Sequence, residues 1–131
     1  MSDTTLRRIG IVLTFMVGLV LAMDAGGKLF APAMMIGNSP PLGLPGDVGF
    51  HRMLGAILAI SLALYVFPRT ALLGAVLLTA YLGGAIATHA RVASPLLSHT
   101  LFGAYLGLLL WAALWLRLPA LRALLPLRNG D

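Results

Sequence analysis

The sequence predicts an all-α polytopic membrane protein, a bundle of four transmembrane helices. Of its 131 residues 60% are hydrophobic and only 10% are charged, with a mean hydropathy of +0.96. A soluble domain carries about 25% charged residues. A water-soluble fold of this length cannot bury so much apolar surface, so lipid must solvate most of it. In addition, the chain contains four apolar segments, and a membrane span needs about 20 residues.

These segments cover approximately residues 9–30, 50–67, 70–89 and 99–116. The first exceeds the 7–15 apolar residues of a secretory signal and has no clean cleavage site, so we expect a retained helix. Pro68 separates the second segment from the third and leaves room only for a tight turn. The chain is therefore expected to form one membrane domain over residues 1–131, with a loop at 31–49 and a tail at 117–131.

Small residues recur at four-residue spacing in these segments and predict close helix contacts. The series are Gly18-Ala22-Gly26, Gly55-Ala59-Ala63, Ala80-Gly84 and Gly103-Gly107. The stretch His51–Ala56 also looks like His99–Ala104. That likeness fits two repeated helical hairpins, and it equally fits chance in a chain so rich in Leu, Gly and Ala.

Basic residues lie at the ends of the segments rather than along one polar face. This pattern indicates membrane orientation and not nucleic-acid binding, despite a net charge of +5. Most of the positive charge falls on the side that holds both termini. The residues on that side are Arg7, Arg8, Arg69, Arg117, Arg122 and Arg128, against Lys28, Arg52 and Arg91 on the other. The positive-inside rule then predicts a bacterial inner-membrane protein with both termini cytoplasmic.

The loop at 31–49 is rich in Pro and Gly, yet it carries Met34, Met35, Ile36, Leu42 and Leu44. A loop this apolar is expected to lie on the bundle, either as a lid or shallow re-entrant turn or as plain structural cover. The chain has no cysteine, which excludes a disulfide framework and a thiolate metal site. Any redox role would therefore need a bound cofactor or partner proteins.

The ionisable groups of the outer side fall at one level of the predicted bundle. Asp24 and Lys28 are four residues apart and share a helix face. All the histidines of the chain lie at the same end. Long basic side chains that reach the headgroups would explain Arg52 and Arg91 without any pocket. They would not explain Asp24, because an unpaired carboxylate in hydrocarbon costs roughly 2.5–3.5 kcal/mol. We therefore favour a shared polar pocket over unconnected boundary residues.

The candidate ligand-binding residues of this pocket come from all four segments. They are Asp24, Lys28, His51, Arg52, Tyr81, His89, Arg91 and His99. For catalysis the candidates are Asp24 and the three histidines, since Asp–His pairs transfer protons near neutral pH. No two histidines have the i, i+3 or i+4 spacing of a local metal site, and the basic residues would repel a cation. The pattern therefore disfavours a metal or haem and favours a quinone-like or lipid-like ligand.

Several stretches of the chain match the pattern of a known family. They are Gly26–Phe30 with Pro32, Phe67–Thr70 with Leu73-Gly74-Ala75, Leu114–Arg117, Leu124-Leu125-Pro126 and, most specifically, the stretch Thr79–Val92. In these stretches the sequence resembles the DoxX-like membrane proteins, and the resemblance implies a four-helix membrane bundle. Members of the family are linked to redox or detoxification complexes, and the family is named after a subunit of a thiosulfate:quinone oxidoreductase. An acidic residue is common in their second helix, near Leu58 here, so no role of that carboxylate carries over.

Three functional hypotheses follow. The first is an inner-membrane protein that binds a small amphiphile in the outer pocket, as a redox-linked or accessory component, with lipids, redox proteins or a second copy as partners. The second is a non-catalytic assembly or scaffold protein. The third is a membrane enzyme whose acid–base chemistry, such as an isomerisation, would use Asp24 and a histidine.

Overall fold

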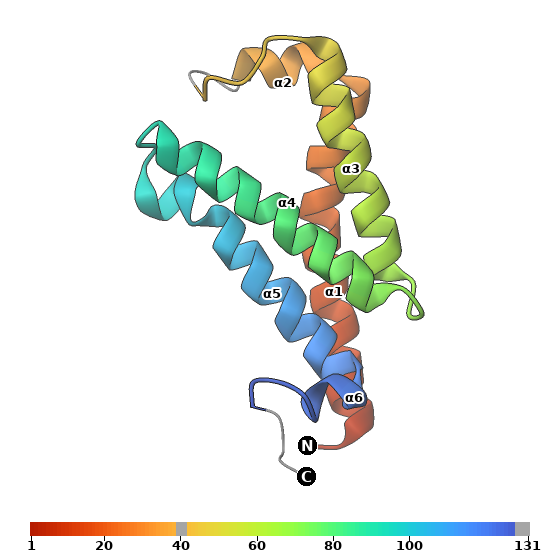
Figure 1. Cartoon of the computed structure of the whole chain (residues 1–131). Helices are drawn as coiled ribbons and strands as arrows, with labels where there is room; N and C mark the ends of the chain where they lie inside the picture. The colour runs from red at the N-terminus through yellow and green to blue at the C-terminus, as the bar shows by residue number, and fades with distance from the viewer. Residues whose placement is uncertain (39–41, 128–131) are drawn as a thin grey trace.

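Four long helices form the structure, a computed structural model that describes residues 1–38 and 42–127 (Figure 1). They are α1 (Asp3–Phe30), α3 (Val48–Val66), α4 (Ala71–Arg91) and α5 (Phe102–Arg117), and a short π-helix, η1 (Leu96–Thr100), precedes α5. All four are long and apolar enough to cross a membrane when η1 is counted with α5. No strand occurs among the described residues. The predicted all-α class with four spans is confirmed.

Local sequence signals explain where the helices start and stop. The hydroxyl of Ser2 accepts a hydrogen bond from the Thr5 amide at 3.2 Å, and the Asp47 carboxylate accepts one from the Phe50 amide at 2.8 Å, so both residues are N-caps. Helix α1 therefore starts at Asp3, well before the predicted residue 9, because the helix continues through polar residues that an apolar segment does not count. Helix α3 ends at Val66, because Phe67 directly precedes Pro68 and a residue before proline disfavours the helical conformation.

The loop between α1 and α3 is not a plain loop, because residues Pro32–Asn38 form a short helix, α2. Its contacts are with α1 and α3, and Figure 1 shows it across one end of the bundle. Ser39, Pro40 and Pro41 lie outside the described residues. After α5, residues Pro119–Arg122 form a further short helix, α6. The tail residue Arg128 also lies outside the described part of the chain.

The long helices pack in a ring in the order α1, α3, α4, α5. Each packs closely against its two neighbours in the ring, whereas across the ring the backbones of α1 and α4, and those of α3 and α5, do not come close. The N-terminus and α6 lie at one end, here called the terminal end, and α2 marks the other, here called the α2 end (Figure 1). At the α2 end the α4–α5 pair leans away from the α1–α3 pair.

Glycines bring neighbouring helices into close contact, as two of the predicted positions show. A Cβ on Gly55 would lie 2.8 Å from the Lys28 Cβ, and one on Gly103 would lie 3.1 Å from the Leu82 carbonyl oxygen. The prediction that small residues mark helix contacts is confirmed at these two positions. They let α1 approach α3 and α4 approach α5.

Other glycines depart from that prediction. A Cβ on Gly26, Gly84 or Gly107 would meet no atom of another helix within 4 Å, so at these three positions the predicted contact is wrong. The tightest approach is instead at Gly74, where a Cβ would lie 2.1 Å from the Tyr65 nitrogen and thus inside the backbone of α3. A four-residue spacing identifies one face of a helix, but it does not say whether that face meets a neighbour.

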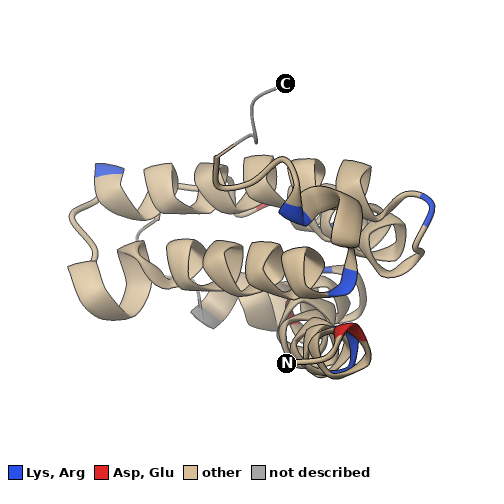
Figure 2. Cartoon of the chain, turned by 90° about the horizontal axis from the view of Figure 1, so that it is seen from below, with Lys and Arg blue, Asp and Glu red and all other residues tan. Residues whose placement is uncertain are grey.

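The core consists of buried apolar side chains from all four long helices. The largest fully buried side chains are Val17, Leu58, Tyr65, Leu78, Leu110 and Leu114. Large apolar side chains also cover the outside, among them Phe15 at 77% exposed and Leu108 at 72%. Positions of Lys and Arg lie at helix ends and in connections (Figure 2). An apolar exterior between charged ends is the surface that a bilayer solvates.

Candidate functional site

A cavity of about 940 Å³ opens at the α2 end, where all four long helices contribute to its wall. Its polar lining consists of Asp24, Lys28, His51, Tyr81, Thr88, His89, Ser94 and His99. The structure thus brings six of the eight predicted ligand-binding residues to one cavity. Its size lies in the range of about 300–1,000 Å³ that is usual for small-molecule sites.

Asp24 and Lys28 form one wall from the last turns of α1. The Lys28 ammonium group donates to the Asp24 carboxylate as an i, i+4 ion pair. The Lys28 nitrogen also lies 6.0 Å from the centre of the Tyr81 ring on α4. The pair neutralises the Asp24 carboxylate, which would be costly to place unpaired in hydrocarbon. Two of the three ammonium protons remain available to a ligand.

His51 is the most enclosed of the three histidines, with only 3% of its surface exposed. Its Nδ1 lies 3.1 Å from the carbonyl oxygen of Asp47. Because a carbonyl oxygen can only accept, Nδ1 must carry the proton of this bond. In a neutral imidazole the lone pair is then on Nε2, so His51 can accept a hydrogen bond from a ligand.

His89 and His99 stand side by side across the α4–α5 connection. Their ring centres are 5.9 Å apart. The Nδ1 of His89 lies 3.1 Å from the Ser94 hydroxyl, and the Nδ1 of His99 lies 2.7 Å from the Ser98 hydroxyl. His99 belongs to η1, a rare π-helical turn of a kind that is frequent at functional sites.

Arg52 and Arg91 do not line the cavity. Arg52 follows His51 on α3 and is exposed on another face of that helix. Arg91 donates a hydrogen bond to the Leu42 carbonyl and packs against Gly43, so it fastens the segment after α2 to the end of α4. Of the three predicted basic ligands, only Lys28 reaches the cavity.

Apolar side chains make up most of the wall, including Leu54, Leu82, Ile86, Phe102 and Leu106. Met35, Leu42 and Leu44 from the 31–49 segment also line it. The unusual apolarity of that segment was the feature that predicted its position over the bundle. Nothing in the sequence indicated that Thr88 or Ser94 would line the cavity. Leu58, near which the family resemblance implies an acidic residue, is buried in the core and does not line the cavity.

Most of the side chains in the cavity that could bind a metal ion carry nitrogen atoms, and they are spread over several helices. Among residues 1–38 and 42–127, no three His, Cys, Asp or Glu side chains lie close enough to hold a metal ion. What the cavity offers is a cation, a phenol and imidazoles against an apolar wall. Such a surface can donate hydrogen bonds to carbonyl or hydroxyl oxygens while it covers a hydrocarbon tail.

A comparison with protein families matches residues 12–113 to a family described as the DoxX-like family. The matched region contains every polar residue of the cavity wall. Comparisons with curated proteins and with solved structures match nothing.

Proposed function

The chain belongs to the DoxX-like family and is an integral membrane protein, and from this premise we propose that it binds a small quinone-like amphiphile in the cavity at the α2 end. The observation that supports the proposal is the cavity itself. Six ionisable or phenolic side chains from four different helical elements face one space of about 940 Å³ whose remaining wall is apolar.

The polar side chains suit the head of such a ligand. A quinone ring carries two carbonyl oxygens, which need hydrogen-bond donors. Lys28 and Tyr81 can donate to one oxygen, and His89 or His99 can donate to the other through Nε2. Their origin on helices, rather than on loops, holds the donors at fixed positions.

The apolar wall suits the tail. Ile86, Phe102 and Leu106 lie on α4 and α5, where these helices continue toward the middle of the bilayer. Burial of a prenyl or alkyl chain there would stabilise the complex by about 0.8 kcal/mol per CH₂ relative to a chain exposed to water. Since the tail would otherwise dissolve in lipid, the net specificity must come from the polar head.

The proposed role is that of an accessory or redox-linked component that holds its ligand for a partner. The proposed location is the bacterial cytoplasmic membrane with both termini in the cytoplasm, so that the cavity faces the outer side. Support comes from the greater number of basic residues at the terminal end among the described residues.

Quinone retention tests the proposal directly. The protein is purified in a mild detergent, and extracted quinones are quantified by mass spectrometry. Decylubiquinone is then titrated against the emptied protein. We expect wild-type protein to retain native quinone near one equivalent and to bind decylubiquinone with saturation.

Two neighbouring glycines provide a matched pair of variants. Gly84 lines the cavity and Gly83 does not, and a Cβ at either position meets nothing within 4 Å. Gly84→Leu should fill part of the cavity and weaken decylubiquinone binding at least tenfold, while Gly83→Leu binds as the wild type does. Equal behaviour of the two variants, or no saturable binding at all, would reject the ligand proposal and favour a scaffold role.

A further inference from the structure

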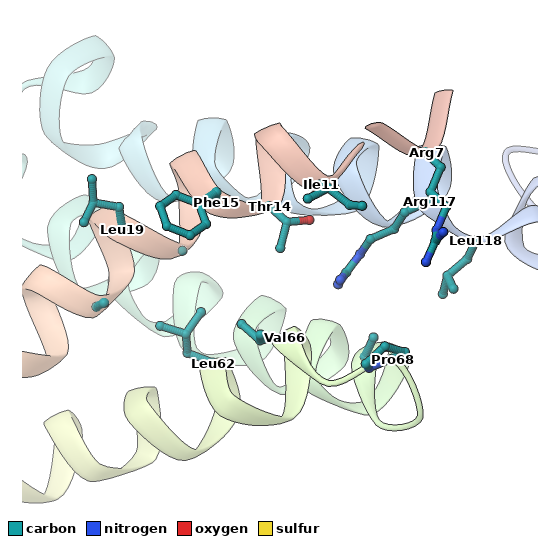
Figure 3. A pocket seen from close by; sticks show the side chains of 13 residues that line it. Arg7, Ile11, Thr14, Phe15, Leu19, Leu62, Val66, Pro68, Arg117 and Leu118 are labelled. Atoms are coloured by element: carbon teal, nitrogen blue, oxygen red, sulfur yellow. The ribbon is translucent and has the colours of Figure 1, made fainter. Parts of the chain in front are cut away.

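A second hollow lies at the opposite, terminal end of the molecule, outside the cavity described above. It is a groove of about 580 Å³ between α1 and α3 that reaches the end of α5. Figure 3 shows Arg7 of α1 and Arg117 of α5 with both guanidinium groups pointing into the same end of this groove. Neither arginine is needed for the proposed ligand site, which makes their convergence a separate observation.

Arg117 is held in place by the core. It donates from Nη2 to the Tyr65 carbonyl oxygen at 2.7 Å, and its guanidinium carbon lies 4.8 Å from the centre of the Tyr65 ring. Its Nε is buried and has no hydrogen-bond partner among the described residues. Arg7 is exposed at the edge of the groove. One charge is therefore preorganised and the other is free to close over a ligand.

The described carboxylates do not neutralise these two charges. Asp3 accepts from Arg122 at 3.0 Å, Asp24 is paired with Lys28 at the far end, and Asp47 caps α3. The groove itself is lined by no Asp or Glu. Two guanidinium groups that converge without a carboxylate, beside an apolar surface, form a site for an anion that carries a hydrophobic chain.

The rest of the groove has the shape and chemistry of an acyl-chain site. Its α1 wall runs from Arg7 through Phe15 to Ala22, with Leu62 and Val66 of α3 opposite. At 1.5 Å per residue this wall is about 22 Å long. One leaflet of the hydrocarbon core is about 15 Å thick, half of the whole. The groove is thus long enough for one acyl chain.

The geometry points to an anionic phospholipid as the occupant. Its phosphate lies between Arg7 and Arg117, and one acyl chain follows the groove between α1 and α3. The site binds lipid from the leaflet at the terminal end, and it is independent of the quinone-like ligand proposed for the α2 end. Bound there, the lipid joins α1, α3 and α5, whose mutual positions also shape the other cavity.

Native mass spectrometry of the detergent-solubilised full chain tests this inference. Palmitoyl-oleoyl phosphatidylglycerol and phosphatidylcholine, which share the same chains, are titrated separately. We expect the anionic lipid to bind about thirtyfold tighter, since each of the two arginines near the headgroups contributes about 1 kcal/mol. Arg7→Gln, which leaves Arg117 in place, should reduce that preference to about fivefold.

Arg8→Gln is the matched control, because Arg8 is adjacent, exposed and absent from the groove. It should leave the preference intact. An equal loss in both variants, or equal affinity for the two lipids in the wild type, would overturn the inference in favour of nonspecific attraction. Displacement of the lipid by millimolar inorganic phosphate would also overturn it, since the site would then be one for free anions.

Gly18→Leu provides a second variant that leaves both arginines in place. Gly18 lines the groove, and a Cβ there would be in ordinary contact with Leu62 at 3.9 Å. The added side chain should weaken the binding of both lipids at least fivefold. An unchanged affinity would contradict the proposed path of the acyl chain. Decylubiquinone binding should be unaffected by Arg7→Gln, so failure of one proposal is distinguishable from failure of the other.

Discussion

Asp24 and Lys28 show how single charged residues are accommodated in an apolar helix. Each neutralises the other, and Lys28 is the better shielded, with 15% of its side chain exposed against 36% for Asp24. A hydrogen bond to a charged group contributes about 1.5–3 kcal/mol, and most of the loss on its removal comes from the partner left behind. The pair therefore acts as a unit in stability as well as in the proposed site.

The stabilities of the wild type, Lys28→Met and a double variant test whether the two residues act as a unit. Lys28→Met leaves the Asp24 carboxylate without its partner and should lower thermal stability in detergent. The double variant Asp24→Asn/Lys28→Met carries no charge here and should recover much of the loss. The measurement is the melting temperature by circular dichroism. A double variant that is less stable than Lys28→Met would show that the two charges act separately.

Tyr65 is a buried polar residue whose role is structural and not ligand binding. Its hydroxyl donates to the Leu110 carbonyl at 2.7 Å and joins α3 to α5 across the ring. Tyr65→Phe should cost about 0.5–1.5 kcal/mol of stability, the usual net contribution of one hydrogen bond. Chemical or thermal unfolding in detergent measures the loss. Tyr105→Phe is the control, because the Tyr105 side chain makes no hydrogen bond among the described residues, and its stability should be unchanged.

At the scale of elements, the contact of α3 with α4 depends on one residue without a side chain. A Cβ at Gly74 would lie 2.1 Å from the Tyr65 nitrogen and 2.4 Å from its Cα, both of them backbone atoms. Backbone cannot swing aside as the end of a flexible side chain can. Pro68 and the short turn further limit how far the two helices can separate.

Gly74→Ala should accordingly destabilise the protein by about 1–3 kcal/mol, the range for an overpacked core. Gly83→Ala lies on the same helix, where its Cβ meets nothing, and should be neutral or stabilise by up to about 1 kcal/mol through helix propensity. Melting temperatures of both variants decide the matter. A Gly74→Ala protein as stable as Gly83→Ala would show that the helices can separate freely.

For the whole molecule, the unequal distribution of arginines predicts the orientation in the membrane. The chain has no cysteine, so an introduced one reports its own position without background. Gly46→Cys lies in the segment before α3 at the α2 end, and Thr4→Cys lies at the terminal end; both positions are exposed. An impermeant thiol reagent should label Gly46→Cys in intact cells and label Thr4→Cys only after the cells are opened. The reverse labelling would place the candidate cavity on the cytoplasmic side.

Much of this architecture was already determined by the sequence. The apolar composition requires lipid as solvent, the lengths of the segments give four spans, and the positions of polar residues along those spans place them at one level. Each of these inferences needs only the position of a residue along a helix axis, which the 1.5 Å rise per residue supplies. The all-α class with four helices able to span a membrane was confirmed for that reason.

Only the tertiary structure decided which way each side chain turns. His51 and Arg52 are adjacent in the sequence, yet His51 lines the cavity and Arg52 lies on another face, and the same holds for Gly84 and Gly83. The rotation of a helix about its axis is set by where its neighbours come closest, here at Gly55, Gly74 and Gly103. Those contacts are between residues far apart in the chain. No periodicity within one segment can reveal them, because it defines faces without saying what each face meets.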